Sequence, residues 1–284
     1  MKFGMNLLLW GGELLEDWLP LMESLKRYGF DGVEIPVFNT DLDYAFWSRH
    51  LDDLGLERTA VTVRNEEDNP ISSDETVRRR GVETTKRVLD CCQALGATSL
   101  VGPYHSAIGI FSGKGPSDDE WNWGVESMRQ VAEHAQQADV ILGVESLNRF
   151  ETYLLNSIAD TVRFVQQVEH PNCRMIYDTF HANIEEKSIR EAVQSCVEVL
   201  AEVHISENDR STPGKGGIRW GDTFDALHEI GYDGWMVIEA FGTALPELAA
   251  ATKIWRKMYP DELQLARDGL DFIRAQVAER WKIH

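Results

Sequence analysis

Short apolar runs alternate with longer amphipathic segments along nearly the whole sequence, and turn residues separate them. The apolar runs are typical of short strands and cover Phe3–Leu9, Val33–Ile35, Arg58–Val63, Ser99–Val101, Ile141–Glu145, Met175–Asp178, Glu202–Ile205 and Trp235–Glu239. Amphipathic helices are predicted over Leu14–Tyr28, Asp43–Leu54, Ser73–Leu95, Ser157–Val168, Ser188–Leu200, Phe224–Ile230 and Asp261–Trp281. This alternation predicts an α/β protein in which eight β-α units close into a (β/α)8 TIM barrel.

An open doubly wound sheet is the alternative fold, but it usually carries a Gly-rich phosphate loop after an early strand. Here the first run is followed by Trp10-Gly11-Gly12-Glu13, which does not fit that motif. An internal similarity favours the barrel, because Gly29–Glu34 and Gly231–Glu239 both describe a helix end, a tight turn and a strand that finishes on glutamate. With no linker in between, we expect residues 1–284 to form a single barrel domain whose outer ring is completed by the C-terminal helix over 261–281.

The charge balance narrows the classes of partner. The chain of 284 residues has 47 acidic and 28 basic side chains, a formal net charge of −19. Such a surface repels phosphate backbones and anionic lipids, so we expect neither nucleic acid nor a membrane as partner. The sequence has no apolar stretch of membrane-spanning length, and its four cysteines lack C-x-x-C spacing. We therefore expect buried free thiols and a cytoplasmic protein.

Polar residues end the last four predicted strands. They are Glu145, Asp178, His204 and Glu239. The carboxyl ends of barrel strands surround the mouth of the active site, so these side chains are expected to meet there. Three carboxylates and one imidazole suit a divalent ion such as Mn²⁺, Mg²⁺ or Co²⁺, with Zn²⁺ as a further alternative.

Several separated motifs make the sequence resemble the xylose-isomerase-like barrel enzymes, and within them the ketose 3-epimerases of the D-tagatose, D-psicose (allulose) and L-ribulose type. The motifs are Glu145 with Asn148–Glu151, Asp178–His181 with Asn183–Glu186, His204 with Glu207 and Arg210, Gly216–Trp220, and Gly231–Gly234 continuing to Glu239 and Phe241. The resemblance spans nearly the whole chain and is densest from residue 145 to residue 241.

The resemblance implies a metal-dependent epimerase that interconverts free ketohexoses or ketopentoses through an enediolate. One divalent ion per subunit, Mn²⁺ first, would be held by Glu145, Asp178, His204 and Glu239, and would chelate the ketose carbonyl and the neighbouring hydroxyl. Glu145 and Glu239 would also act as the acid/base pair, one on each side of the reacting carbon. The substrate contacts expected in this way are Glu151, His181, Arg210, Trp10, Phe241 and His105.

The sequence departs from the family pattern at several positions. Asn6 replaces an aromatic residue, Ser206 a common Gly, and Ala240 a frequent Pro. The loops that begin at Val63-Arg64 and Gly102-Pro103 also differ, and these loops shape the far end of the sugar. Arg64 is expected to pair with a neighbouring acidic residue, or else to bind a phosphate or carboxylate of the substrate. The surface pairing of Arg210 with Asp209 or Glu207 is the alternative to its role at the site.

Other functions also fit parts of the pattern. An aldose–ketose isomerase would use the same metal site, and a sugar-binding protein would use the pocket without turnover. Abasic-site endonucleases share the barrel, but their multi-zinc centre needs more histidines and a basic groove. The apolar run Ala249–Trp255, followed by Met258-Tyr259-Pro260, is expected to contribute to a homodimer or homotetramer contact, or to pack inside the chain.

Overall fold

The computed structural model describes residues 1–243 and 246–281, so residues 244–245 and 282–284 of the expected barrel domain lie outside it. Its strands close into one barrel, in which each strand pairs in parallel with the next and β8 pairs with β1. They are β1 (Lys2–Asn6), β2 (Gly32–Pro36), β3 (Glu57–Val61), β4 (Ser99–Gly102), β5 (Ile141–Glu145), β6 (Cys173–Asp178), β7 (Leu200–Ile205) and β8 (Trp235–Ile238). The predicted (β/α)8 TIM barrel is confirmed, and the open sheet is excluded.

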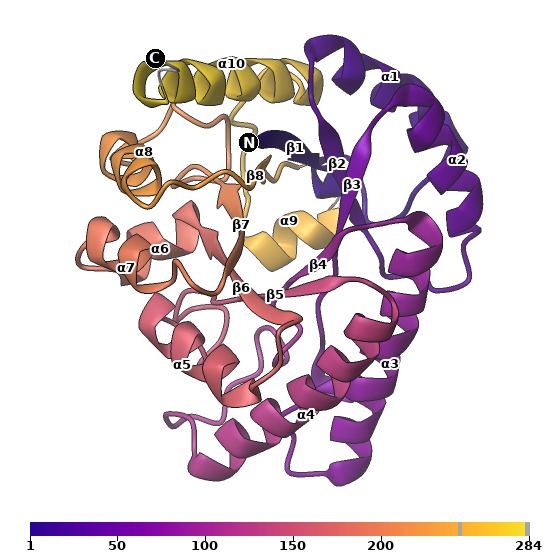
Figure 1. Cartoon of the computed structure of the whole chain (residues 1–284), viewed down its shortest axis with the longest axis vertical. Helices are drawn as coiled ribbons and strands as arrows, with labels where there is room; N and C mark the ends of the chain where they lie inside the picture. Colours follow the sequence, from indigo (N-terminus) through magenta and orange to yellow (C-terminus); the bar gives the residue numbers. More distant parts are fainter. Residues whose placement is uncertain (244–245, 282–284) are drawn as a thin grey trace.

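Helices form an outer ring around the barrel (Figure 1). They are α1 (Leu19–Tyr28), α2 (Tyr44–Leu54), α3 (Glu75–Leu95), α4 (Asp118–Gln137), α5 (Ile158–Val168), α6 (Thr179–Glu185), α7 (Ile189–Ser195), α8 (Trp220–Glu229) and α10 (Glu262–Arg280). The last of these, α10, contacts both α1 and α8 and lies in the outer ring. A further helix, α9 (Pro246–Thr252), lies inside the ring, over the barrel (Figure 1).

The first strand is shorter than predicted. Residues Leu7–Leu9 form a 3-10 helix, η1, instead of continuing β1. The side chain of Asn6 accepts a hydrogen bond from the backbone N–H of Leu8 at 2.8 Å, which caps this turn and stops the strand. All three leucines are buried, so this segment is apolar because it packs in the core and not because it forms a strand. Two more 3-10 helices, η2 (Glu16–Trp18) and η3 (Glu66–Asp68), precede α1 and α3.

The core has two parts. A large cluster fills the space between the barrel and the outer helices, and α5 contributes to it from one face through Ile158, Phe164, Val165 and Val168. A smaller cluster at the barrel mouth consists of Leu8, Val61, Val101, Ile176, Phe241, Ala249 and Ile254. This second cluster fixes α9 over the mouth, because Ala249 is one of its buried members.

The apolar run from residue 249 to residue 260 packs inside the chain only in part. Ala249, Ile254 and Tyr259 are buried, whereas Trp255 is 73% exposed. The expected subunit contact therefore stays a prediction that depends chiefly on Trp255.

The four cysteines are buried and free, as the sequence predicts. Within residues 1–243 and 246–281, no helix is long and apolar enough to cross a bilayer.

Candidate metal centre and substrate pocket

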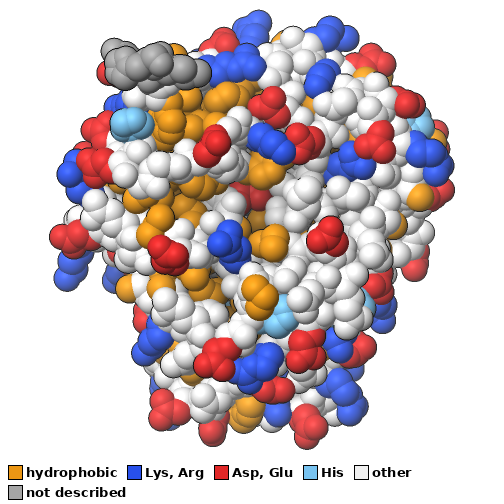
Figure 2. All heavy atoms as spheres, in the orientation of Figure 1, with side chains coloured by type: hydrophobic (Ala, Val, Ile, Leu, Met, Phe, Trp, Pro, Cys, Tyr) orange, Lys and Arg blue, Asp and Glu red, His pale blue; other side chains and the backbone are white. Residues whose placement is uncertain are grey.

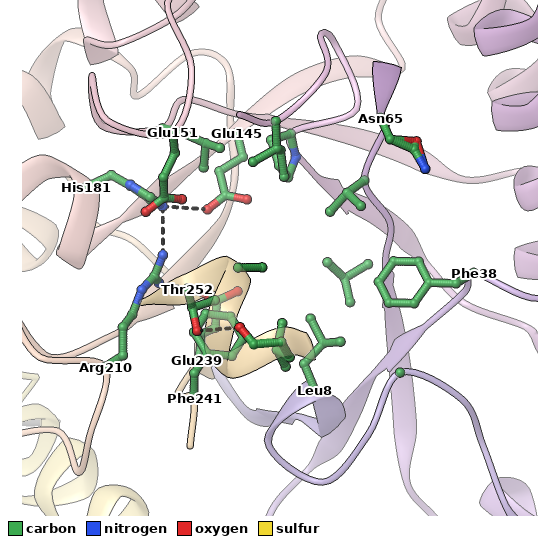
Figure 3. Close-up of a pocket in the computed structure, with 18 of the residues that line it drawn as sticks. Leu8, Phe38, Asn65, Glu145, Glu151, His181, Arg210, Glu239, Phe241 and Thr252 are labelled. Carbon is green, nitrogen blue, oxygen red and sulfur yellow. Dashed lines mark hydrogen bonds and ion pairs between the residues drawn. The ribbon is translucent and has the colours of Figure 1, made fainter. Parts of the chain in front are cut away.

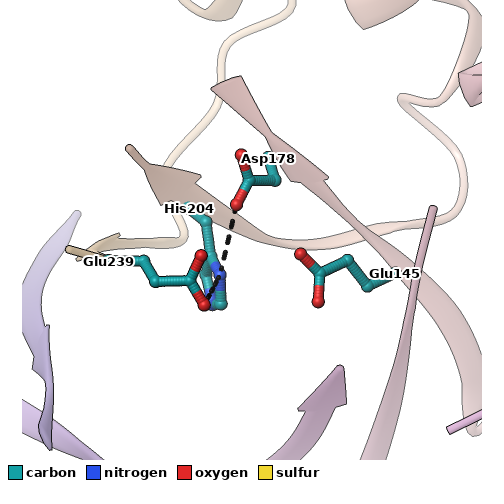
Figure 4. Close-up of side chains that lie close together, drawn as sticks. All are labelled: Glu145, Asp178, His204 and Glu239. Atoms are coloured by element: carbon teal, nitrogen blue, oxygen red, sulfur yellow. Dashed lines mark ion pairs between the residues drawn. The ribbon is translucent and has the colours of Figure 1, made fainter. Parts of the chain in front are cut away.

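The four strand-end residues meet at one point in the barrel mouth (Figure 4). Glu145 and Asp178 are the last residues of β5 and β6, His204 lies in β7, and Glu239 follows β8 directly. Each residue offers one ligand atom, and these atoms lie within 4.8 Å of one another. All four side chains are buried. Barrel closure thus brings together residues that are up to 94 positions apart (239 − 145 = 94), as the strand-end spacing predicts.

Local structure orients the ligand atoms. Asp178 is also the N-cap of α6, where its Oδ1 accepts hydrogen bonds from the backbone N–H groups of Phe180 and His181 at 2.6 and 3.2 Å. The other oxygen, Oδ2, is left facing the cluster, 3.8 Å from Nδ1 of His204. The same Nδ1 lies 3.5 Å from Oε1 of Glu239.

The donor set fits a divalent cation. Among the described residues, Nδ1 of His204 is buried without a hydrogen-bond partner, and it faces the carboxylates of Asp178 and Glu239. Three buried carboxylates repel one another, and an unpaired charge is costly away from water. Three oxygen donors and one imidazole nitrogen form a ligand set that Mn²⁺, Mg²⁺ or Co²⁺ accepts. We conclude that these residues fit a single ion.

Burial and neighbouring charges shift the pKa values of the two glutamates in opposite directions. Burial, together with the charges of Glu239 and Asp178, raises the pKa of Glu145 well above its ordinary value. Burial also acts on Glu239, but the charge of Arg210 outweighs it and lowers the pKa of Glu239. The pKa of Asp178 is raised to about 7 by burial, against the opposing charge of Arg210. Two carboxyl groups of opposite tendency are what an acid/base pair requires.

Arg210 lies beside this cluster and not at the surface. Its guanidinium donates hydrogen bonds to the carboxylate of Glu239 and, at 3.0 Å, to Oγ of Ser206. The guanidinium also lies over the ring of Phe180, 3.8 Å from the ring centroid, and 5.0 Å from that of Phe241. The backbone of Arg210 has φ of 62°, a left-handed conformation that costs energy for a residue other than glycine. The alternative of a surface pair with Asp209 or Glu207 is therefore wrong.

His181 and Glu151 complete the polar side of the site. Nδ1 of His181 accepts a hydrogen bond from the backbone N–H of Asn148 at 2.9 Å, and its Nε2 lies 3.0 Å from a guanidinium nitrogen of Arg210. Burial and the nearby charge of Arg210 lower the pKa of His181 well below its ordinary value, so the ring is neutral. Its Nε2 lies 3.6 Å from Glu145 (Figure 3). Glu151 accepts a hydrogen bond from the side chain of Asn148 at 2.8 Å.

These residues line a pocket of about 830 Å³ (Figure 3). One end carries Glu145, Glu239, Glu151, His181 and Arg210, with Phe241 beside them. The rest of the lining is mostly apolar and includes Leu8, Phe38, Val61, Val63, Pro103 and Ile108, with Asn65 as a polar member. Phe38 and Asn65 lie across the pocket from His181 and Arg210 (Figure 3). Leu248, Ala251 and Thr252 of α9 also line the pocket. Figure 2 shows acidic and basic side chains spread over one face of the molecule, with hydrophobic side chains between them.

Sequence reasoning found part of this lining. The loops after the third and fourth strands were expected to shape the far end of the sugar, and Val63 and Pro103 from these loops line the pocket. It missed Phe38, Asn65 and α9, because no charge or spacing pattern marks them. The hydrophobic run over residues 249–255 was the available signal for α9.

Two expected substrate contacts lie elsewhere. His105 is fully buried, packs near the ring of Phe164, and does not line the pocket. Burial lowers its pKa to about 3, so it is a neutral core residue. Trp10 is partly buried against the main core cluster and is also absent from the pocket lining. Arg64 pairs with Asp68 at 2.8 Å, one of the partners expected from the sequence.

Comparison with known proteins agrees with the geometry. The xylose isomerase-like TIM barrel family matches residues 22–276. The chain is 33% identical over 275 residues to a probable ketose 3-epimerase of Synechocystis sp., covering 96% of each chain. It is 30% identical over 278 residues to a D-psicose 3-epimerase of Enterocloster bolteae, covering 95% of this chain and 91% of that protein. The solved structure of an L-ribulose 3-epimerase superposes with a TM-score of 0.94 at 29% identity, covering 99% of this chain and 95% of that one.

Proposed function

The chain belongs to the xylose isomerase-like TIM barrel family, among relatives that are ketose 3-epimerases, and from this premise we propose that it epimerises a free ketose at carbon 3. We propose a ketohexose or a ketopentose as substrate, because the named relatives act on psicose or ribulose. We further propose one divalent ion per subunit, with Mn²⁺ first and Mg²⁺ or Co²⁺ as alternatives.

The observation that carries this proposal is the pair Glu145 and Glu239. They come from β5 and from the end of β8, which are not neighbours in the barrel, and their carboxylates approach the cluster from opposite sides (Figure 4). Inversion of a carbon needs one group to remove a proton from one face and another to deliver a proton to the opposite face. Two glutamates in this arrangement supply both groups.

The residues perform the proton transfers as follows. Glu145, Asp178, His204 and Glu239 would hold the ion, which supplies positive charge to stabilise the negative charge that develops on the substrate's carbonyl oxygen. In one direction the carboxylate of Glu239 removes the proton from carbon 3, and the electron pair moves onto the carbonyl oxygen to give an enediolate. Glu145, in its protonated form, then delivers its proton to the other face of carbon 3. The reverse reaction exchanges the two roles.

The remaining polar residues hold the sugar. His181 lines the pocket with its Nε2 between Glu145 and Arg210, at 3.6 and 3.0 Å, where the ring can contact a substrate oxygen. Arg210 keeps Glu239 in its ionised form and so preserves a base on that side. Glu151 lines the same end of the pocket and can accept a hydrogen bond from a sugar hydroxyl.

Three further properties belong to the same proposal. We propose that residues 1–284 work as one barrel domain and that the protein is a homodimer or homotetramer with Trp255 at a contact. We propose a cytoplasmic location, because four buried free thiols fit a reducing compartment. The partner is the sugar, and neither nucleic acid nor a membrane is expected.

Product identification tests the proposal. The purified protein is stripped with a chelator, reloaded with Mn²⁺, and incubated with ketohexoses, ketopentoses and the matching aldoses. We expect ketoses to give their 3-epimers and stripped protein to give no product. Aldoses formed from ketoses would favour the aldose–ketose isomerase, and tight binding of a sugar without product would favour a sugar-binding protein.

A further inference from the structure

A second group of buried polar side chains lies inside the barrel, next to the candidate metal centre. It consists of Asn6, Glu34, Thr59, Ser99 and Glu202, none of which is more than 6% exposed. Asn6, Glu34 and Thr59 are register partners on the neighbouring strands β1, β2 and β3. The proposed reaction assigns no role to this group.

Glu34 is the member that contacts a candidate ligand. Nε2 of His204 lies 3.2 Å from its Oε1 and 3.3 Å from its Oε2, and both side chains are fully buried. The carboxylate of Glu34 is itself fixed, since Asn6 donates to Oε1 at 2.7 Å and Thr59 donates to Oε2 at 3.1 Å. An anionic acceptor in a fixed position therefore faces the ring nitrogen that points away from the candidate metal centre.

This arrangement selects which nitrogen of His204 is free to bind an ion. A neutral imidazole has one lone pair, on the nitrogen that lacks the proton. A carboxylate at Nε2 holds the proton on that nitrogen, so the lone pair is on Nδ1, which faces Asp178 and Glu239. A carboxylate behind a ligating histidine also fixes the ring plane and makes the imidazole a better donor.

We propose that Glu34 is a positioning residue of the metal centre, which holds Nε2–H of His204 so that Nδ1 is presented to the ion, and that Asn6 and Thr59 keep Glu34 in place. The inference deepens the proposed function and rests on its metal site.

Asn6 extends this arrangement to a second ligand. Its amide nitrogen lies 2.7 Å from Glu34 and 3.4 Å from Oε1 of Glu239, while its oxygen caps η1. One asparagine therefore contacts the glutamate behind His204 and the glutamate that is expected to act as base. These are the two glutamates that finish the similar segments Gly29–Glu34 and Gly231–Glu239. The asparagine stands where the resembling family has an aromatic residue, which has no amide to donate in this way.

A second ion is the competing interpretation of the same residues. Glu34, Glu202 and His204 offer ligand atoms within 4.8 Å of one another, and Oε1 of Glu202 is buried without a partner among the described residues. However, His204 would have to bind through Nε2, and a neutral ring cannot do so while Nδ1 binds the first ion. Both oxygens of Glu34 are also already engaged by Asn6 and Thr59. We therefore favour positioning over a second ion.

The test measures Mn²⁺ affinity by calorimetry on protein stripped with a chelator. Glu34→Gln keeps the size of the side chain and removes its charge, and we expect the dissociation constant to rise by about 10- to 100-fold. The matched control is Glu207→Gln, because Glu207 is equally buried but is held by Gly214, Ile218 and Trp220, away from the cluster. The Mn²⁺ dissociation constant of the control variant should stay within about twofold of the wild-type value.

A spectroscopic signature separates positioning from general loss of structure. In protein loaded with Co²⁺, the ring N–H of His204 should give a shifted proton signal that exchanges slowly with D₂O, because Glu34 holds it in a buried site. In Glu34→Gln the signal should exchange faster or shift.

If Glu34→Gln does not fold, Asn6→Ala tests whether Glu34 positions His204. Loss of its hydrogen bond to Glu34 should weaken Mn²⁺ binding by about two- to tenfold.

Failure of this inference can be distinguished from failure of the proposed function. If the wild type does not bind Mn²⁺, or if Asp178→Asn leaves its affinity unchanged, the proposed metal site itself is wrong. If Asp178→Asn abolishes binding while Glu34→Gln and Asn6→Ala both stay within about twofold of the wild type, only the positioning role is overturned. Two Mn²⁺ ions per chain, with one lost in Glu202→Gln, would also overturn it in favour of a second ion.

Discussion

The guanidinium of Arg210 donates a hydrogen bond to the carboxylate of Glu239, and both side chains are buried in the barrel mouth. Glu145, the other glutamate of the pair, has no such partner among the described residues. Its carboxylate lies 3.6 Å from His181, whose ring is neutral. The buried cation therefore gives two carboxyl groups of the same kind different pKa values. This inequality assigns the base in one direction to Glu239 and the acid to Glu145.

The first prediction concerns this cation. Arg210→Met removes the charge and keeps an apolar side chain, so the pKa of Glu239 should rise, because Arg210 is the largest influence that lowers it. The acidic limb of the pH profile of kcat/KM should therefore move to higher pH, together with a fall in rate. The profile is measured on protein saturated with Mn²⁺.

Arg149→Met is the matched control for Arg210→Met. Arg149 forms an ion pair with Glu185 at 2.7 Å but is 63% exposed and does not line the pocket. Its replacement should leave the profile where it was. An acidic limb that stays in place in Arg210→Met, or that moves to lower pH, contradicts the assignment of Glu239 as the base held ionised by Arg210.

The second prediction concerns the two glutamates. Glu145→Gln and Glu239→Gln should each lower the rate of epimerisation by about 10²- to 10⁴-fold, the range expected for loss of a general acid or base. Each variant keeps one glutamate, so it should still exchange the carbon-3 proton of one epimer with D₂O, without inversion. The two variants should prefer opposite epimers.

Exchange and inversion are followed by NMR on the same samples, with the metal content of each variant measured alongside. Variants that retain the ion yet lose exchange from both epimers would contradict the two-sided mechanism. So would two variants that prefer the same epimer.

The third prediction concerns pH and metal binding. The pKa of Asp178 is raised to about 7 and that of Glu145 is raised well above its ordinary value, so both carboxyl groups carry protons in part of the neutral range. A cation must displace these protons, and the apparent affinity for Mn²⁺ should therefore increase as the pH rises from about 6 to about 8. Calorimetry in two buffers of different ionisation enthalpy should detect proton release on binding. Affinity that is flat or falls over this range would show that the carboxyl groups are already ionised.

The fourth prediction concerns the far end of the substrate. The apolar lining formed by Leu8, Phe38, Val61, Val63 and Pro103 has Asn65 as its polar member. A 6-deoxyketose therefore loses at most about one hydrogen bond there and should match its parent sugar in kcat/KM within about tenfold. A ketose 6-phosphate should be a much poorer substrate, because its charges would be desolvated against this apolar lining while Arg210, the cation in the described lining, lies at the other end. Preference for the phosphate would contradict the orientation of the sugar.

Much of the fold and of the metal centre could be predicted because both depend on periodic features of the sequence. Strand ends recur along the chain, and closure of the barrel then places Glu145, Asp178, His204 and Glu239 together. Register within a strand fixes which side chains face inward, so a polar residue at the end of an apolar strand is a strong signal. The prediction of four converging residues needed nothing beyond this.

The parts that could not be predicted depend on contacts between distant segments. The run Leu7–Leu9 looks like strand, but the cap formed by Asn6 turns it into a 3-10 helix. His105 follows a strand, as the site residues do, yet it packs into the core beside Phe164. Glu34 was visible as a glutamate in a strand, but its role depends on His204, which is 170 residues away in the sequence.

The central claim is that carbon 3 of a ketose is deprotonated and reprotonated between Glu145 and Glu239. The most direct test is the position of deuterium after the Mn²⁺-loaded protein equilibrates a single ketose in D₂O. We predict deuterium at carbon 3 of both epimers and at no other carbon. Deuterium at carbon 1 of the ketose or carbon 2 of an aldose, with none at carbon 3, would contradict the claim and identify the protein as an aldose–ketose isomerase.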